Sequence, residues 1–261
     1  MAKPDFLSAQ VAESFQDQSV VEAYQHRPGY PVEAFKFLTQ LAGGAHGCVL
    51  DVGCGTGVIA RNMVDAVHLV DAVDASAAMI ARARYLPNGN SKMINWIVGR
   101  MEDVPLHRTY DLILAGDSLH WMNWEIVLPR FRSLLRPKCH LAIATVDASP
   151  PKWNSELLAL IRKYSTIQNY QAYDMIQVLK EMNLFREIGR HRTSQIPFVQ
   201  SLDEYVESFH GRASFSRQRM QLEAAEEFDE AVRQVVAKHT KSVVEQSISA
   251  EIVWGEPAPL T

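Results

Sequence analysis

The chain has 261 residues, of which 47% are hydrophobic and 21% are charged, and its formal net charge is −4. This balance suits one α/β domain with a substantial core and argues against a general nucleic-acid binder, which needs a basic surface to neutralise phosphates. Three cysteines without metal-ligand spacing exclude a disulfide framework and predict reduced thiols in a cytoplasmic protein. We expect no secretory signal, no membrane partner and no metal, because the sequence shows no apolar N-terminal run, no spanning segment and no ligand motif.

Helical spacing of apolar residues begins the chain, over 7–24 and 32–42, with the turn YQHRPGYP at 24–31 between them. From residue 48, short apolar runs alternate with helical patterns, which is typical of βαβ units around a parallel sheet covered on both faces. The predicted strands are 48–52, 68–73, 94–98, 111–115 and 140–146, and the helices between and after them are 57–66, 76–85 and 123–135.

The rhythm changes after Asp147. Further helices are predicted at 154–164, 173–183, 201–210 and 222–240, and further strands at 186–199 and 243–254. We therefore expect an α/β fold with a Rossmann-like, doubly wound, mainly parallel seven-stranded sheet and a helical cap. We expect it to be one domain over 1–261, made of an N-terminal helical cap (1–45), a cofactor-binding core (46–147) and a substrate cap with the last strands (148–261).

The sequence LDVGCGTGVIA at 50–60 places three alternating glycines, Gly53, Gly55 and Gly57, at the end of the first predicted strand. Glycines there let a ligand approach the backbone closely, and three of them are more than a simple turn needs. The spacing differs from the dinucleotide pattern G-x-G-x-x-G, because Val58 takes the third glycine's place. Asp51 would repel a pyrophosphate and attract an ammonium or sulfonium group, so the motif favours a cationic ligand.

Asp74 ends the next predicted strand and is placed to accept hydrogen bonds from both hydroxyls of a ribose. Asp71 competes for this role but falls within the strand, and Ser76 is the expected N-cap of the following helix. Alone, Asp74 would more simply be a turn residue; beside the glycine motif it favours a nucleoside.

These residues resemble a known family. The stretches YQHRPGYP, VLDVGCGTGVIA, VDASAAMIARAR, VGRMEDVP, YDLILAGDSLHWM and FRSLLRP, within residues 20–147, are similar to class I S-adenosylmethionine-dependent methyltransferases of the small-molecule branch that includes trans-aconitate methyltransferase. The resemblance implies S-adenosyl-L-methionine as cofactor. The cofactor-binding residues that it implies are Tyr24, Arg27, Asp51, Gly53, Cys54, Gly55, Asp74, Ala75, Met79, Met101, Glu102, Ala115 and Gly116.

The chemistry left to the protein depends on the acceptor. A carboxylate is already ionised at neutral pH and needs only hydrogen-bond donors, whereas a hydroxyl or phenol would need a base. His120, after the fourth strand, is the candidate base, with a helix cap as the simpler alternative, and Trp121 is a candidate substrate contact or a packing residue. Asp117 is interpreted as a turn residue. Six arginines lie within 186–219, and among them Arg212, in GRASFSR, is the candidate to bind a substrate carboxylate.

The function predicted is methyl transfer from S-adenosylmethionine to a small molecule, to oxygen, with a carboxylate as one candidate acceptor. A protein that keeps the cofactor pocket without methylating, or a lyase or cyclase built on it, would show the same motif. The acidic balance and the AGDSLHW sequence argue against a macromolecular acceptor, and the glycine spacing argues against a nicotinamide oxidoreductase.

Overall fold

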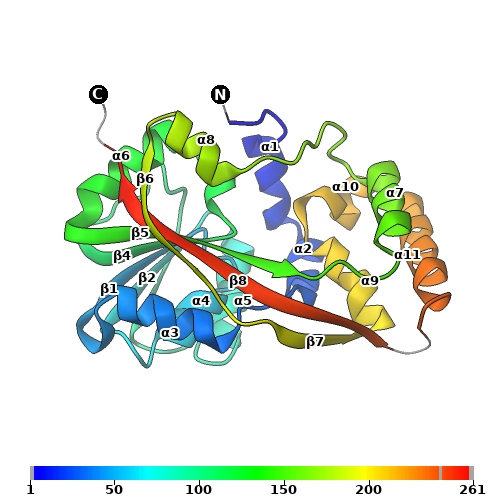
Figure 1. The fold of residues 1–261 in the computed structure, drawn as a ribbon, viewed down its shortest axis with the longest axis horizontal. Helices are drawn as coiled ribbons and strands as arrows, with labels where there is room; N and C mark the ends of the chain where they lie inside the picture. The colour runs from blue at the N-terminus through cyan, green and yellow to red at the C-terminus, as the bar shows by residue number, and fades with distance from the viewer. Residues whose placement is uncertain (1–2, 241–242, 259–261) are drawn as a thin grey trace.

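The structure is a computed structural model, and it describes residues 3–240 and 243–258. At its centre lies a mostly parallel sheet in the order β3-β2-β1-β4-β5-β8-β6, with β7 paired to β8 (Figure 1). The strands are β1 (Cys48–Val52), β2 (Leu69–Asp74), β3 (Ile94–Val98), β4 (Tyr110–Gly116), β5 (Leu135–Ala148), β6 (Phe185–Arg192), β7 (Ile196–Ser201) and β8 (Val243–Pro257). β1 to β5 pair in parallel, whereas β8 is antiparallel to β5, β6 and β7. The expected α/β fold is confirmed.

Helices cover both faces of the sheet and build a cap at one end (Figure 1). They are α1 (Ala9–Ala12), α2 (Gln18–Ala23), α3 (Val32–Leu41), α4 (Val58–Met63), α5 (Ala77–Tyr85), α6 (Trp124–Leu134), α7 (Asn154–Tyr164), α8 (Met175–Glu181), α9 (Leu202–His210), α10 (Arg217–Met220) and α11 (Leu222–Ala237). Short 3-10 helices occupy Glu13–Gln16, Tyr24–His26, Gly44–His46, Leu119–Trp121 and Ala213–Phe215.

Alternate strand residues point to opposite faces of the sheet, and each face is packed. Leu50 and Ile113 belong to a cluster that includes Phe131 of α6, whereas Val49 belongs to one that includes Leu38 of α3. The cap has its own apolar cluster, which includes Phe209 and Phe228, and the long β8 runs from that cluster to the sheet (Figure 1). The expected boundaries at 45 and 147 stay a prediction.

Two predicted elements are divided in the structure. The segment 186–199, expected as one strand, forms β6 and β7, so that eight strands occur among the described residues where seven were expected. Ser194 leaves the ladder because its N–H donates to the Glu33 carboxylate at 2.9 Å. The expected helix over 7–24 breaks at Asp17, which has extended backbone and whose carboxylate binds Ser216 and Arg219 of the cap.

Candidate functional site

The turn between β1 and α4 has the left-handed backbone that glycine tolerates best. Gly53, Gly55 and Gly57 have φ values of 63°, 55° and 69°. A Cβ on Gly53 would lie 2.6 Å from the Cβ of Ser118, and one on Gly57 would lie 2.2 Å from the Trp96 ring. Gly53 and Gly57 therefore allow close packing. A Cβ on Gly55 would have the Tyr24 hydroxyl oxygen as its nearest atom, at 3.4 Å.

Asp74 is held against this turn by two backbone hydrogen bonds. Its carboxylate accepts from the N–H of Gly55 and from the N–H of Ser76, both at 2.7 Å. Ser76 is the N-cap of α5, as predicted, because its hydroxyl accepts from the N–H of Met79. Burial raises the pKa of Asp74, and each carboxylate oxygen keeps a lone pair for a further donor such as a hydroxyl.

A cavity of about 260 Å³ opens beside Asp74. It brings together the predicted cofactor residues Tyr24, Gly53, Gly55, Asp74, Ala75, Met79, Met101 and Glu102, and also Trp121. The sequence interpretation missed one wall of it, which comes from the N-terminal segment and includes Ala12, Phe15 and Gln16. We name this space the nucleoside cavity, because an apolar slot next to a carboxylate suits a base and a ribose.

A second space, of about 410 Å³, lies on the other side of Tyr24 and Gly53. It is lined by Arg27, Asp51, Cys54 and Gly116, which were all predicted, and by Asp117. We name it the glycine-turn cavity. Ala115 differs from the prediction: its side chain is fully buried in the core cluster on one face of the sheet and lines none of the three cavities described for residues 3–240 and 243–258.

Asp51 is almost completely buried, with 2% of its surface exposed. Its carboxylate accepts one hydrogen bond, from the N–H of Ala60 at 3.3 Å, and burial raises its pKa to about 7. Asp51 therefore carries only part of a negative charge at neutral pH. A cation beside Asp51 would lower this pKa and favour the carboxylate, so the interaction of Asp51 with a cationic ligand stays a prediction.

The largest of these three cavities, of about 680 Å³, contains the predicted His120, Trp121 and Arg212 together with Arg27. Its other walls are largely apolar and aromatic, and include Phe6, Ile143, Tyr173 and Ile176. It shares Phe15, Trp121 and Asp117 with the nucleoside cavity. We name it the acceptor cavity, because a second reactant could reach the nucleoside cavity from it.

Arg212 differs from the five other arginines of the 186–219 stretch. Arg186, Arg190, Arg192, Arg217 and Arg219 each form an ion pair with a carboxylate, whereas Arg212 has no such pair among the described residues. Its guanidinium lies 4.9 Å from the Phe209 ring and borders the acceptor cavity. Surrounding protein lowers its pKa to about 10, so it stays charged at neutral pH.

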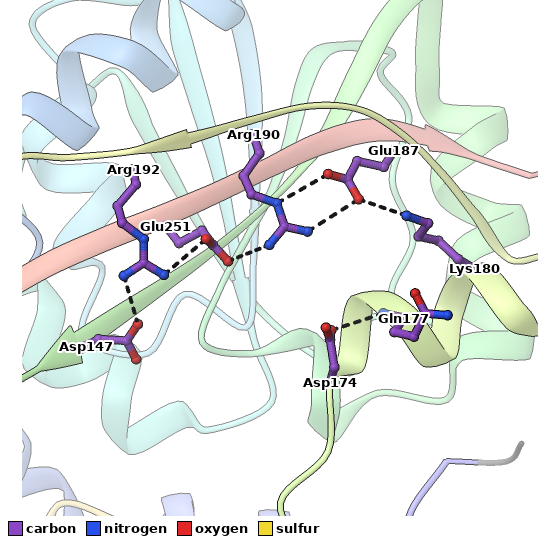
Figure 2. Close-up of polar contacts among 8 residues, drawn as sticks. All are labelled: Asp147, Asp174, Gln177, Lys180, Glu187, Arg190, Arg192 and Glu251. Atoms are coloured by element: carbon purple, nitrogen blue, oxygen red, sulfur yellow. Dashed lines mark hydrogen bonds and ion pairs between the residues drawn. The ribbon is translucent and has the colours of Figure 1, made fainter.

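Several of the paired charges form a continuous network across β5, β8, β6 and α8 (Figure 2). Arg192 contacts Asp147 and Glu251, Arg190 contacts Glu251 and Glu187, and Lys180 contacts Glu187. Asp147, Arg190 and Glu251 also line the acceptor cavity. Since three cations balance three carboxylates here, this network offers a ligand little net charge.

His120 lies against Trp121, with ring centroids 4.7 Å apart. Burial and the nearby Arg27 and Lys3 lower its pKa to about 4, so the imidazole is neutral at pH 7. A base with so low a pKa accepts protons poorly, because a general base works best with a pKa near the working pH.

Asp117 is the residue that the sequence interpretation underrated. It is the one residue common to the linings of the nucleoside, glycine-turn and acceptor cavities. The available signal was its position directly after β4, since open α/β sheets bind ligands outside the carboxyl ends of their central strands.

Within 3–240 and 243–258, no helix is long and apolar enough to cross a membrane. The same residues contain no group of three or more His, Cys, Asp or Glu side chains arranged to hold a metal ion.

Comparison with known proteins agrees with this geometry. Residues 49–138 match a family model described as "Methyltransferase domain". The chain is 30% identical over 154 residues to the uncharacterized methyltransferase Rv3342 of Mycobacterium tuberculosis, which is 57% of each chain. It is 25% identical over 114 residues to a ubiquinone biosynthesis O-methyltransferase of Bradyrhizobium diazoefficiens, covering 43% of this chain and 44% of that one. The matches thus span about half the length of these relatives.

Solved structures with the same fold include a protein of Anaeromyxobacter dehalogenans described as a candidate type II methyltransferase. It superposes with a TM-score of 0.62 at 21% identity, covering 90% of this chain and 99% of that one. The YcgJ protein of Bacillus subtilis superposes with a TM-score of 0.54 at 13% identity, covering 87% of this chain and 99% of that one. At these identities the likeness shows the fold.

Proposed function

We propose that this chain, which carries a class I methyltransferase domain, transfers a methyl group from S-adenosylmethionine to an oxygen atom of a small acidic molecule. One observation carries the choice of an acid: Arg212, which forms no ion pair among the described residues, borders the acceptor cavity, which meets the nucleoside cavity at Asp117 and Trp121. The O-methyltransferase among the relatives supports oxygen as the acceptor atom. The resemblance to trans-aconitate methyltransferase that the sequence suggested is also part of this proposal.

The residues around the nucleoside and glycine-turn cavities fit the cofactor. The glycine turn leaves a cradle that a Cβ at Gly55 would begin to fill, and Asp74 offers acceptor oxygens to a ribose. Met79 and Met101 present apolar surface to a base. Burial raises the pKa of Asp51, Asp74 and Asp117, so three carboxyl groups there lack enough water, and a cation would relieve that cost.

When bound, S-adenosylmethionine supplies a methyl group already activated by a sulfonium, so the residues of this chain need only bind, orient and exclude water. Arg212 can hold a carboxylate through two parallel N–H donors, which fixes the direction in which its oxygens point. An ionised carboxylate needs no base, in agreement with the low pKa of His120. Aligning two reactants in this way removes several kcal/mol of the barrier, up to about 7–11 kcal/mol in favourable cases.

Mass spectrometry of reactions with methyl-labelled S-adenosylmethionine and a panel of carboxylic acids, phenols and amines tests the activity. We expect labelled esters from acids. Labelled phenols or amines would overturn the acid assignment and shift attention to His120, while cofactor binding without any labelled product would favour the non-methylating alternative.

Arg212→Ala tests the acid anchor, with Arg186→Ala as the matched control because Arg186 is paired with Glu256 and lies outside the acceptor cavity. A charge-assisted hydrogen bond contributes about 1.5–3 kcal/mol, so KM for an acid should rise about 10- to 100-fold in Arg212→Ala. Arg186→Ala should leave KM unchanged. Equal KM values in all three proteins would contradict the role of Arg212.

A further inference from the structure

Asp117 lies at the centre of the sheet's ligand-binding edge. The strand order reverses between β1 and β4, and ligands of open α/β sheets bind outside the carboxyl ends of the strands at such a point. Gly53 follows β1 and Asp117 follows β4, and these strands pair in parallel. Because Ser118 would contact any Cβ on Gly53, the two turns touch. Asp117 is thus next to the backbone that the cofactor must approach.

One side of the Asp117 carboxylate is fixed by the protein. Its Oδ2 accepts from the Tyr30 hydroxyl at 2.8 Å and from the N–H of Val146 at 3.3 Å. Among the described residues no donor reaches Oδ1 and no ion pair forms with this carboxylate, while the charge of the nearby Arg27 favours its ionised form. Asp117 is half-buried and Oδ1 is not enclosed by protein, so a ligand that supplies a donor can reach this oxygen.

The backbone of Asp117 is also constrained. Its φ is +49°, a left-handed value that costs a residue with a Cβ about 1–2 kcal/mol. The N–H of Asp117 donates to the Ala144 carbonyl at 2.9 Å and so holds the residue in this conformation. Strain of this kind at a ligand-binding edge is typical of a side chain that must point in a particular direction.

The two ends of the cofactor would meet different residues. Asp74 and the apolar slot of Met79 and Met101 suit the ribose and the base, so the amino-acid end extends past Gly53 and Tyr24. The residues shared by the nucleoside and glycine-turn cavities at this point are Tyr24, Gly53 and Asp117. Of these, Asp117 alone has a carboxyl group.

We propose that the free Oδ1 of Asp117 accepts a hydrogen bond from the ammonium group of the cofactor's amino-acid end. This inference rests on the proposed function and moves to Asp117 a role that the sequence suggested for Asp51. The ammonium is the fitting partner because it has N–H donors, whereas the sulfonium has none. Asp51 lines the glycine-turn cavity alone, whereas Asp117 borders both the glycine-turn and the nucleoside cavities.

Isothermal titration calorimetry of three ligands on purified full-length protein tests the proposal. S-adenosylmethionine and S-adenosylhomocysteine both carry the ammonium, and only the first carries the sulfonium; 5′-methylthioadenosine carries neither. Asp117→Asn should raise Kd for the first two equally, by about tenfold or more, and leave Kd for methylthioadenosine within about twofold. Asp65→Asn is the control, since Asp65 is exposed and borders none of the three cavities, and all three Kd values should stay unchanged.

Two outcomes would overturn the proposal: a loss of affinity for S-adenosylmethionine alone, which would mean that Asp117 meets the sulfonium, and unchanged affinity for all three ligands. Asparagine tolerates left-handed backbone as well as aspartate does, so Asp117→Asn should fold, and retained methylthioadenosine binding verifies this. If that binding is lost, Asp117→Glu decides: the charged variant should bind S-adenosylhomocysteine more tightly than Asp117→Asn, and equal binding would refute a role of the charge. Wild-type protein that binds no S-adenosylmethionine would instead overturn the proposed function.

Discussion

Asp51 and Arg212 show how burial decides the behaviour of single charged residues in this site. Both lack a partner of opposite charge among the described residues. Asp51 lies within the protein and has a pKa of about 7, so it alternates between the neutral and charged forms near neutral pH. Arg212 borders a cavity and keeps its charge, because even a pKa of about 10 lies well above neutral pH. The two residues therefore differ in charge at neutral pH: Asp51 is only partly ionised, whereas Arg212 stays charged.

The pKa of Asp51 predicts how stability depends on pH. In the folded protein this pKa is about 7, against 3.8 for the unfolded chain, so the folded state holds the proton more tightly. The contribution of Asp51 to the free energy of unfolding is then fully present below pH 4 and is lost as the pH rises through 7. This contribution is about 4 kcal/mol in total. Asp51→Asn cannot ionise, so its free energy of unfolding relative to wild type should increase between pH 5 and pH 8.

Urea denaturation of the ligand-free proteins at these two pH values measures the difference. Asp65→Asn is the control, because Asp65 is exposed. A difference between wild type and Asp51→Asn that is the same at pH 5 and pH 8 would show that Asp51 ionises normally.

The turn between β1 and α4 is the element whose shape the sequence specifies most tightly. All three glycines have positive φ, but only Gly53 and Gly57 would also bring a Cβ into overlap with a neighbour. Left-handed backbone costs about 1–2 kcal/mol for alanine, and overpacking adds about 1–3 kcal/mol. The glycines therefore differ in what a substitution would cost.

Thermal unfolding of Gly53→Ala and Gly55→Ala separates the two costs. Gly55→Ala should lower Tm by the amount due to backbone conformation, about 2–8 °C at 2–4 °C per kcal/mol for a chain of this size. Gly53→Ala should lower Tm further, because its Cβ would meet Ser118 at 2.6 Å. If Tm fell by the same amount in both variants, the turns after β1 and β4 would lie farther apart than the structure indicates.

The sequence predicted those parts of the fold that are determined by residues close together in the chain. The alternation of strands and helices over 48–146, the glycine turn and the Ser76 cap are all confirmed. The break at Asp17 and the division between β6 and β7 could not be predicted, because partners more than a hundred residues away in sequence, Arg219 and Glu33, cause them. For the same reason the sequence could not show which arginine lacks a carboxylate, or that Asp117 borders three cavities.

At the scale of the whole molecule, segments far apart in sequence enclose the nucleoside cavity. The N-terminal helices α1 and α2 lie between the sheet and the cap (Figure 1). Their connection reaches both: the Phe15 carbonyl accepts from the Ser76 hydroxyl at 2.8 Å, and Asp17 pairs with Arg219 of α10 at 2.7 Å. The segment covering the cavity is thus attached to the core on one side and to the cap on the other.

This arrangement predicts that the N-terminal segment responds to the cofactor. Segments that cover ligand sites open more easily than the core, and a ligand that contacts them slows that opening. Amide hydrogen exchange of residues 9–16 should therefore slow when S-adenosylhomocysteine binds.

Arg219→Ala removes the attachment to Asp17 and to the Gln10 carbonyl, so exchange of residues 9–16 should become faster and Kd for S-adenosylhomocysteine should rise severalfold. Arg233→Ala, which removes a pair with Asp203 on the cap surface, should change neither quantity. Exchange over 9–16 that is equal with and without S-adenosylhomocysteine would contradict the covering role, since a segment in contact with the ligand must be protected by it.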